Sequence, residues 1–167
     1  MVDANQQWTL SKALVVIDKL REMNPYWVEE PTDPDDVLAH QTLARAFHPI
    51  RIALGEHVSN KALFKNFLQA NAMEINQVDA LRVGGISEFI LISLMSRKCG
   101  VPVIPHVGDM GQIHQHMVLF NHISMSHPKM FLECIPHLRK YFKDPATIED
   151  GVYLVPQTPG SSSDFNN

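Results

Sequence analysis

Six ionisable side chains recur at nearly constant intervals along the 167 residues of this chain. They are Asp3, Glu29, Glu56, Asp79, His106 and Glu133, separated by 26, 27, 23, 27 and 27 residues. The first five each close a short, mostly apolar segment, and the sixth lies near the end of another. The spacing predicts a repeated structural unit that returns one ionisable side chain to the same place in each copy.

The first three members of the series, Asp3, Glu29 and Glu56, are carboxylates. Carboxylate oxygens are hard ligands that suit Mg²⁺, which completes its octahedron with water and substrate oxygens. A divalent ion held here could bind a substrate carboxylate and stabilise the enediolate that forms when the α-proton leaves. A single acid at a strand end is more often a loop residue or a helix cap than a ligand. The prediction of a metal site therefore rests on the series as a set.

The last three members could move protons. A carboxylate beside an imidazole fixes its tautomer and raises its basicity, so Asp79 and His106 together are typical of a general base. Glu133 could hydrogen-bond the developing enediolate if it is protonated. Two further residues are expected to support a ligand or to contact the substrate: Asn5 and His57.

The other histidines are interpreted as surface or loop residues. His114 and His116 are two residues apart on a predicted helix. Side chains at that separation do not share a helix face, so the pair makes a poor chelate.

Strand-like and helix-like segments alternate along the chain. After a first strand ending at Asp3, the predicted strands are residues 26–30, 50–56, 73–79, 101–106 and 129–135. The predicted helices are residues 10–23, 35–47, 60–71, 86–98 and 112–123. This alternation predicts an α/β fold with right-handed βαβ units and a parallel sheet. A (β/α)₈ barrel points its strand ends at one mouth, whereas an open sheet spreads them along a line, so the series favours a barrel.

The stretch "YWVEEP", residues 26–31, ends in two adjacent carboxylates. Glu29 is the one in phase with the series. Side chains alternate along a strand, so Glu30 is expected to face the helical shell or the following loop and to have a structural role.

Composition and charge argue against several classes of protein. Hydrophobic residues make up 45% of the chain and charged residues 19%, which suits one globular domain. The formal net charge of −4 and the lack of a dense Lys/Arg run argue against nucleic-acid binding. The two cysteines, Cys99 and Cys134, form no C-x-x-C motif and are expected to be buried in a reducing compartment. The sequence shows no signal peptide and no apolar stretch long enough to cross a membrane.

Five motifs occur in a characteristic order and spacing: "VDANQQW", "WVEEPTDPDD", "ALGEH", "QVDALRVGGISE" and "VPVIPH". As a set they resemble the mandelate racemase group of the enolase superfamily, from residue 2 to about residue 160. With "NKALFKNFLQANA" added, the chain is most similar to acid-sugar dehydratases such as L-fuconate dehydratase.

The resemblance implies a role for each member of the series. The first three members, Asp3, Glu29 and Glu56, match the Mg²⁺ ligands. Asp79 and His106 match an Asp-His dyad, and Glu133 matches the acid on the last strand. The implied reaction removes the α-proton of an aldonate and then the β-hydroxyl, giving a 2-keto-3-deoxy acid sugar.

The chain also departs from the family that it resembles. That family has an N-terminal capping domain and earlier barrel strands, one of which carries a Lys-x-Lys motif. Nothing here corresponds to it, because the nearest strand lysine, Lys129, begins its predicted strand and would face the wrong end of the barrel. After His106 the chain reads "HVGDMGQIHQH" in place of a glycine-rich "HAGG"-like loop, which leaves the substrate open.

We therefore expect a partial TIM-type (β/α) barrel of about six βα units, corresponding to strands 3 to 8. Residues 1–145 would form the C-terminal part of the barrel, and residues 146–167 a partly flexible extension. The chain is expected to be part of a longer enzyme, with little activity alone. Alternatives are a racemase or epimerase of the same superfamily, or a truncated, non-catalytic isoform that binds or regulates a partner.

The remaining expectations concern partners and location. We expect a small acid-sugar substrate, no nucleic-acid or membrane partner, and a homo-oligomer in the longer form. The expected location is the cytoplasm, with the mitochondrion as the alternative.

Overall fold

The chain folds around a parallel sheet whose strands alternate with helices. The computed structural model describes residues 1–107, 112–126 and 131–167. The main sheet has the order β1-β2-β3-β4, with every neighbouring pair parallel. Its strands are β1 (Val2–Asp3), β2 (Trp27–Glu29), β3 (Arg51–Leu54) and β4 (Ile75–Asn76). Strand order follows chain order, as it does in successive βαβ units, so the predicted α/β class and parallel sheet are confirmed.

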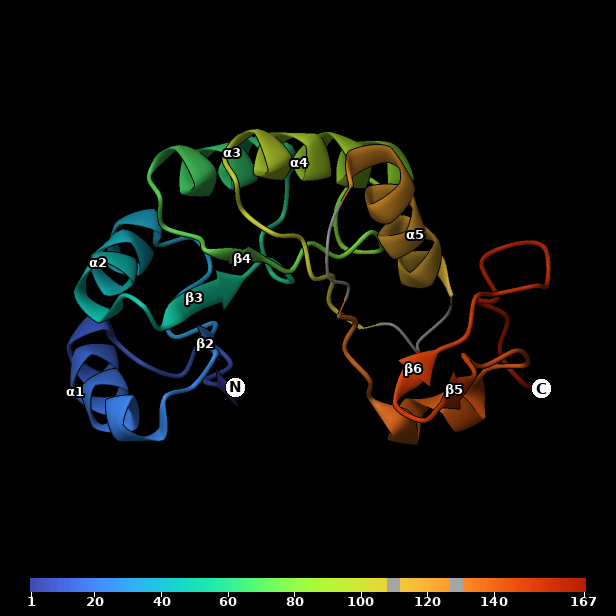
Figure 1. Cartoon of the computed structure of the whole chain (residues 1–167), viewed down its shortest axis with the longest axis horizontal. Helices are drawn as coiled ribbons and strands as arrows, with labels where there is room; N and C mark the ends of the chain where they lie inside the picture. The colour runs from blue at the N-terminus through green and yellow to red at the C-terminus, as the bar shows by residue number, and fades with distance from the viewer. Residues whose placement is uncertain (108–111, 127–130) are drawn as a thin grey trace.

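The helices lie along the outer side of an arch whose inner side carries the strands (Figure 1). The helices of the described part are α1 (Leu10–Leu20), η1 (Arg21–Met23), α2 (Val37–Phe47), α3 (Lys61–Gln69), α4 (Ile86–Lys98), α5 (Ile113–Met125) and η2 (Pro136–Tyr141). The side chains of Thr9, Asp36 and Asn60 accept hydrogen bonds from first-turn backbone N–H groups of α1, α2 and α3. No helix among the described residues is long and apolar enough to cross a membrane.

The main apolar core lies between the sheet and the helices. Val28, Ile52 and Leu54 of the strands pack there with Phe64 and Phe67 of α3, and all five are buried. A smaller cluster is formed by alternate strand positions and their neighbours: Ala53, Ile75, Ile104 and Trp27. Apolar side chains thus line both faces of the sheet, which leaves the strand ends for polar chemistry.

The predicted strand 101–106 is reduced to one residue pair. Val103 forms an isolated parallel bridge with Asn76 of β4. Pro102 and Pro105 have no backbone N–H to donate, which limits the ladder in this segment.

The last predicted strand is not formed by its described residues. Residues 131–135 have no strand, and residues 129–130, which include Lys129, lie outside the described part. Residues 131–135 are instead positioned by a hydrogen bond of 2.7 Å that the Tyr153 hydroxyl donates to the Glu133 carbonyl. Because residues 101–106 pair with β4 only at Val103, they offer no strand edge to which residues 131–135 could add. The described sheet therefore has four strands and one bridge, not six strands.

Both cysteines are exposed, so the expectation that they are buried is wrong. Cys99 is the C-cap of α4 and precedes Gly100, whose positive φ turns the chain away from the helix. Cys134 lies in the irregular segment that replaces the last predicted strand.

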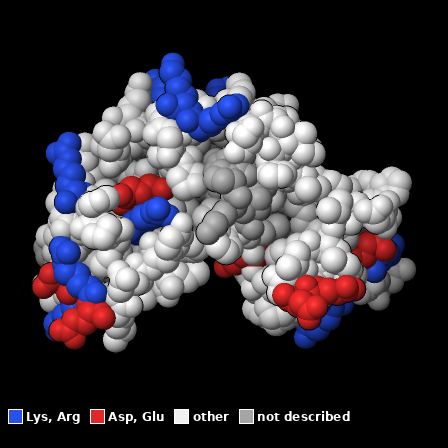
Figure 2. All heavy atoms as spheres, viewed as in Figure 1, with Lys and Arg blue, Asp and Glu red and all other residues white. Residues whose placement is uncertain are grey.

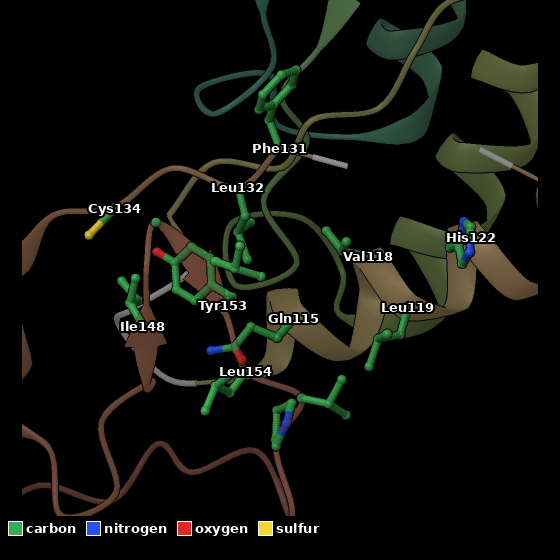
Figure 3. A pocket seen from close by; sticks show the side chains of 14 residues that line it. Gln115, Val118, Leu119, His122, Phe131, Leu132, Cys134, Ile148, Tyr153 and Leu154 are labelled. Carbon is green, nitrogen blue, oxygen red and sulfur yellow. The ribbon is translucent and has the colours of Figure 1, made fainter. Parts of the chain in front are cut away.

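A short antiparallel hairpin, β5 (Ile148–Glu149) and β6 (Val152–Tyr153), packs beside α5. Figure 3 shows the apolar cavity of about 570 Å³ between them, with Leu132, Val118 and Leu119 among its lining side chains. Since Tyr153 bonds to the backbone of Glu133, the hairpin helps to place that residue.

Charged side chains occur in small groups of both signs on the face shown in Figure 2, and most of that face is uncharged. The same face is notched between the part that carries the sheet and the part that carries the hairpin.

Gly55, which joins β3 to Glu56, is expected not to tolerate alanine. Its φ is +151°, and a Cβ there would lie 2.7 Å from backbone atoms of Gln77. Backbone strain and overpacking together predict that Gly55→Ala lowers the free energy of unfolding by about 3 kcal/mol, measurable by urea denaturation. Gly100→Ala is the matched control, because Gly100 also has positive φ but has open space around it. We expect the control to cost about 1 kcal/mol, and equal losses would contradict the argument from crowding.

Candidate functional site

Asp3 and Glu29 are direct neighbours in the sheet, since the register of β1 and β2 pairs them. Asp3 is exposed, whereas Glu29 is 2% exposed and accepts a hydrogen bond of 2.9 Å from Trp27 Nε1. Burial and the neighbouring carboxylates of Asp3 and Glu133 raise the pKa of Glu29 to about 6. Hydrogen bonds from Gln77 and Trp27 only partly offset this rise. The surroundings of Glu29 are thus crowded with negative charge.

Glu56 lies beyond the end of β3 and connects several groups. Its Oε1 is 3.1 Å from Arg82 Nη1 and 3.2 Å from His57 Nδ1, and its Oε2 is 3.3 Å from His106 Nε2. Burial, aided by the carboxylate of Glu30, raises the pKa of Glu56, although Arg82 and the imidazoles of His106 and His57 act in the opposite direction.

Asp79 lies between two imidazole rings. Its Oδ2 is 2.8 Å from His106 Nδ1, and its Oδ1 is 3.1 Å from His114 Nε2. Oδ1 also accepts a hydrogen bond of 2.7 Å from the backbone N–H of Leu81. Burial favours the neutral acid, but the hydrogen bonds from the two histidines and Leu81 outweigh it and hold the pKa of Asp79 far below its usual range. Asp79 is therefore a carboxylate at neutral pH.

His106 is buried, and its Nδ1 is hydrogen-bonded to Asp79 Oδ2. Burial disfavours its protonated form, but the bond to Asp79 and the carboxylates of Glu56 and Glu133 raise its pKa. Its Nε2 is 3.6 Å from Glu133 Oε2, which also accepts a hydrogen bond of 3.1 Å from Val107 N–H. Glu133 thus lies beside His106 although the described part of its segment forms no strand.

The two predicted supporting residues both contact a proposed ligand. The backbone N–H of Asn5 donates to Asp3 Oδ1 at 2.8 Å. His57 approaches Glu56, as described above, and its side chain is 37% exposed.

Glu30 takes part in a cluster that strand alternation did not predict. Its φ is +39°, so the chain leaves the strand geometry at this residue. His57 Nδ1 lies 2.9 Å and 3.0 Å from the two Glu30 carboxylate oxygens, and Gln6 Nε2 donates to Oε2 at 2.8 Å. Among the described residues, Glu30, Glu56 and His57 form a group whose ligand atoms all lie within 4.8 Å of one another. Such a group could hold a metal ion.

Two residues of the site, Arg82 and His114, were not expected from the sequence. Arg82 follows Asp79 by three residues, and its Nε lies 3.6 Å from Asp79 Oδ2. A basic residue shortly after a strand-closing acid was an available signal. His114 comes from α5 and meets Asp79 across 35 positions of the chain, a contact for which the sequence carries no local signal.

All 167 residues match the family described as "Enolase C-terminal domain-like". The chain belongs to this family. The predicted resemblance to the enolase superfamily is thereby confirmed.

Two curated relatives of this enolase-family chain match almost its whole length. Mitochondrial enolase superfamily member 1 of Homo sapiens is 39% identical over 171 residues, which cover 99% of this chain and 39% of that protein. L-Galactonate dehydratase of Hypocrea jecorina is 38% identical over 166 residues, which cover 97% of this chain and 37% of that protein. The chain thus spans about two fifths of the length of these relatives.

Solved structures share the arrangement. The crystal structure of the human protein superposes with a TM-score of 0.92 at 39% identity, covering 99% of this chain and 39% of that one. L-Talarate dehydratase from Polaromonas sp. JS666, complexed with Mg and L-glucarate, gives a TM-score of 0.77 at 32% identity, covering 93% and 41%.

The carboxylates around Glu29 could also hold a divalent cation in this enolase-family chain. Glu29 has a raised pKa partly because the carboxylates of Asp3 and Glu133 lie near it. A bound cation would relieve this crowding of like charges. All-oxygen ligand sets of this kind suit Mg²⁺.

The raised pKa of Glu29 predicts a pH dependence of stability in the metal-free chain. In the folded state the pKa of Glu29 is about 6, whereas the ordinary pKa of a glutamate is 4.5. Over that window the folded state binds more protons than the unfolded state, so stability falls as pH rises. A shift of this size corresponds to about 2 kcal/mol. Urea denaturation with EDTA from pH 4 to 7 measures it.

Glu29→Gln provides the control for this pH dependence, because glutamine has a similar shape and does not titrate. Subtracting the variant's stability curve from that of the wild type isolates the contribution of Glu29. Parallel curves across the window would contradict the prediction.

Proposed function

We propose that this chain carries the proton-transfer part of the active site of a magnesium-dependent dehydratase of acid sugars, such as L-fuconate-like aldonates. The observation that carries the proposal is the Asp79–His106 pair, with the other ring nitrogen of His106 facing Glu56 and Glu133. The Asp3–Glu29 pair lies at the end of the same sheet. Relatives named as L-galactonate dehydratase and L-talarate/galactarate dehydratase support the reaction class.

His106 would act as the general base. Asp79 accepts the hydrogen bond from Nδ1, which leaves the Nε2 lone pair free to take the proton from the carbon next to the substrate carboxylate. The raised pKa of His106 makes it a stronger base than an isolated imidazole.

The second half of the reaction breaks the bond between the β-carbon and its hydroxyl. The hydroxyl would leave as water with the proton that His106 had taken, and the resulting enol would tautomerise to a 2-keto-3-deoxy acid sugar. Glu133, whose Oε2 lies 3.6 Å from His106 Nε2, would hydrogen-bond the developing enediolate oxygen if it carries a proton.

Asp3, Glu29 and Glu56 would hold the magnesium ion. When bound, Mg²⁺ would anchor the substrate carboxylate and offset the negative charge that develops there. His57 and Asn5 would support these carboxylates through the contacts described above.

The proposed activity requires a complete barrel, to which these residues contribute one part. We propose that residues 1–145 supply the segments that correspond to strands 3 to 8 of such a barrel, with their helices, and that residues 146–167 are an extension. In the described sheet β1 pairs with β2 alone, and Asp3 is exposed at that edge. We therefore expect the 167-residue chain to have little activity alone.

The experiment compares the 167-residue chain with the longest chain that the gene encodes around it. Each is incubated with Mg²⁺ and a panel of aldonates and aldarates, and 2-keto-3-deoxy products are detected as semicarbazones. The proposal predicts product from at least one acid sugar and none with EDTA. No product from any acid sugar would overturn the dehydratase assignment.

A parallel incubation in D₂O separates the alternatives. Deuterium entering the α-position with inversion and without loss of water would indicate a racemase or epimerase. Neither exchange nor product, in the longest chain as well, would instead favour a non-catalytic binding role.

A further inference from the structure

We propose that His114 is a positioning residue that holds the Asp79 carboxylate in the orientation that His106 requires. This inference rests on the proposed function, because it gives His114 a role in supporting the proposed base. His114 would touch neither the substrate nor the metal ion.

The geometry places one imidazole on each oxygen of the Asp79 carboxylate. His106 Nδ1 lies 2.8 Å from Oδ2, and His114 Nε2 lies 3.1 Å from Oδ1. The hydrogen bond from Leu81 N–H to Oδ1 adds a third contact. A carboxylate held at both oxygens cannot rotate freely, so the direction of its bond to His106 is determined.

His114 is itself firmly held. It is 1% exposed, it lies at the start of α5, and its ring is 6.4 Å from that of Phe89 on α4. Among the described residues its polar contacts are with Asp79 and with the backbone of Ala80, and not with the proposed metal ligands. The ring therefore links α5 and α4 to the segment after β4 that carries Asp79.

The proton on His114 decides which contact is made. The backbone N–H of Ala80 lies 2.9 Å from Nε2, the same nitrogen that faces Asp79. One nitrogen cannot accept from an amide and donate to a carboxylate at the same time. The other nitrogen, Nδ1, is buried without a hydrogen-bond partner among the described residues.

The Nε2-protonated tautomer is the one that explains these surroundings. Within the described part of the chain, each tautomer leaves one buried donor without an acceptor, namely Nδ1–H when the proton is on Nδ1 and the Ala80 N–H when it is on Nε2, so the bond to Asp79 decides between them. A proton on Nε2 makes a charge-assisted hydrogen bond to Asp79, which is stronger than the neutral bond from Ala80. We therefore expect His114 to donate from Nε2 to Asp79 Oδ1.

The first test reads the tautomers directly. The chain labelled with ¹⁵N-histidine is examined by long-range ¹H–¹⁵N correlation NMR at a pH at which both rings are neutral. The proposal predicts that His114 carries its proton on Nε2 and His106 on Nδ1. A wild-type spectrum with the His114 proton on Nδ1 would overturn it, and this measurement needs no variant.

The second test asks whether His114 acts on His106. In His114→Leu the Nδ1-bound proton of His106 should exchange with water at least about 10-fold faster, because Asp79 is held less firmly. His114→Gln, whose amide can still donate to Asp79, should restore slow exchange. His116→Leu, two residues further along α5 and bonded to the carbonyl of Gly160, is the matched control and should leave His106 unchanged.

A folded His114→Leu chain, checked by circular dichroism, with unchanged exchange at His106 would overturn the proposal. If the leucine variant does not fold, His114→Gln and the wild-type tautomer still decide. Neither test needs turnover, so failure of the dehydratase assay and failure of this inference are separate results.

Discussion

Replacing His106 with asparagine is expected to lower kcat for acid-sugar dehydration by about 10³-fold. Asparagine can keep a hydrogen bond to Asp79, but it cannot accept the α-proton. The KM should change little, because the substrate carboxylate would be held by the metal ion. Steady-state kinetics on the longest chain that contains these residues, together with exchange of the α-proton in D₂O, measure the effect.

His57→Asn is the matched control for this prediction. His57 also contacts Glu56, but its side chain is 37% exposed and its contacts include Glu30 in place of Asp79. We expect a loss of less than about 10-fold, since a supporting residue affects the site indirectly. If His57→Asn abolished exchange and His106→Asn did not, the base would be wrongly assigned.

Glu29→Gln is expected to weaken Mg²⁺ binding by about 100-fold or more. The substitution removes a charged ligand, and even residues that only support ligands are worth 10- to 100-fold in affinity. Isothermal titration of the chain with Mg²⁺ measures the affinity. A stabilisation of about 2.7 kcal/mol at 100 times the dissociation constant provides an independent readout.

Glu30→Gln discriminates between two carboxylate sets that share Glu56. If the ion is held by Asp3, Glu29 and Glu56, the Glu30 variant should bind Mg²⁺ within about 3-fold of the wild type. If the cluster of Glu30, Glu56 and His57 holds it, the effects of the two substitutions should be reversed. The two glutamates are adjacent in sequence and both are 2% exposed, so they are closely matched.

Much of the fold could be predicted because local signals agree with it. The helix predicted over residues 86–98 has those bounds in the structure, where Gly100 ends it with positive φ. The helix predicted over residues 112–123 covers Ile113–Met125. Apolar periodicity and turn residues are local properties, which is why they can be read from the chain.

The strands of the last third could not be predicted in the same way. Residues 101–106 and 131–135 are apolar enough to suggest strands, but a strand needs a neighbour that offers hydrogen-bond partners. With prolines at two of six positions, the first segment pairs only through Val103, and the second has no strand in its described part. Pairing depends on the neighbouring backbone, which a strand's own sequence does not describe.

The sequence by itself predicted which side chains would lie near the strand ends, since one βα unit recurs every 23 to 27 residues and brings the chain back to the same edge of the sheet. Asp79 and His106 could be paired on that ground. The tertiary structure alone decided how these groups meet. It turned Glu30 towards His57 through one residue of positive φ, and it brought His114 from α5 against Asp79. Such contacts depend on backbone direction and helix packing, which residue spacing does not encode.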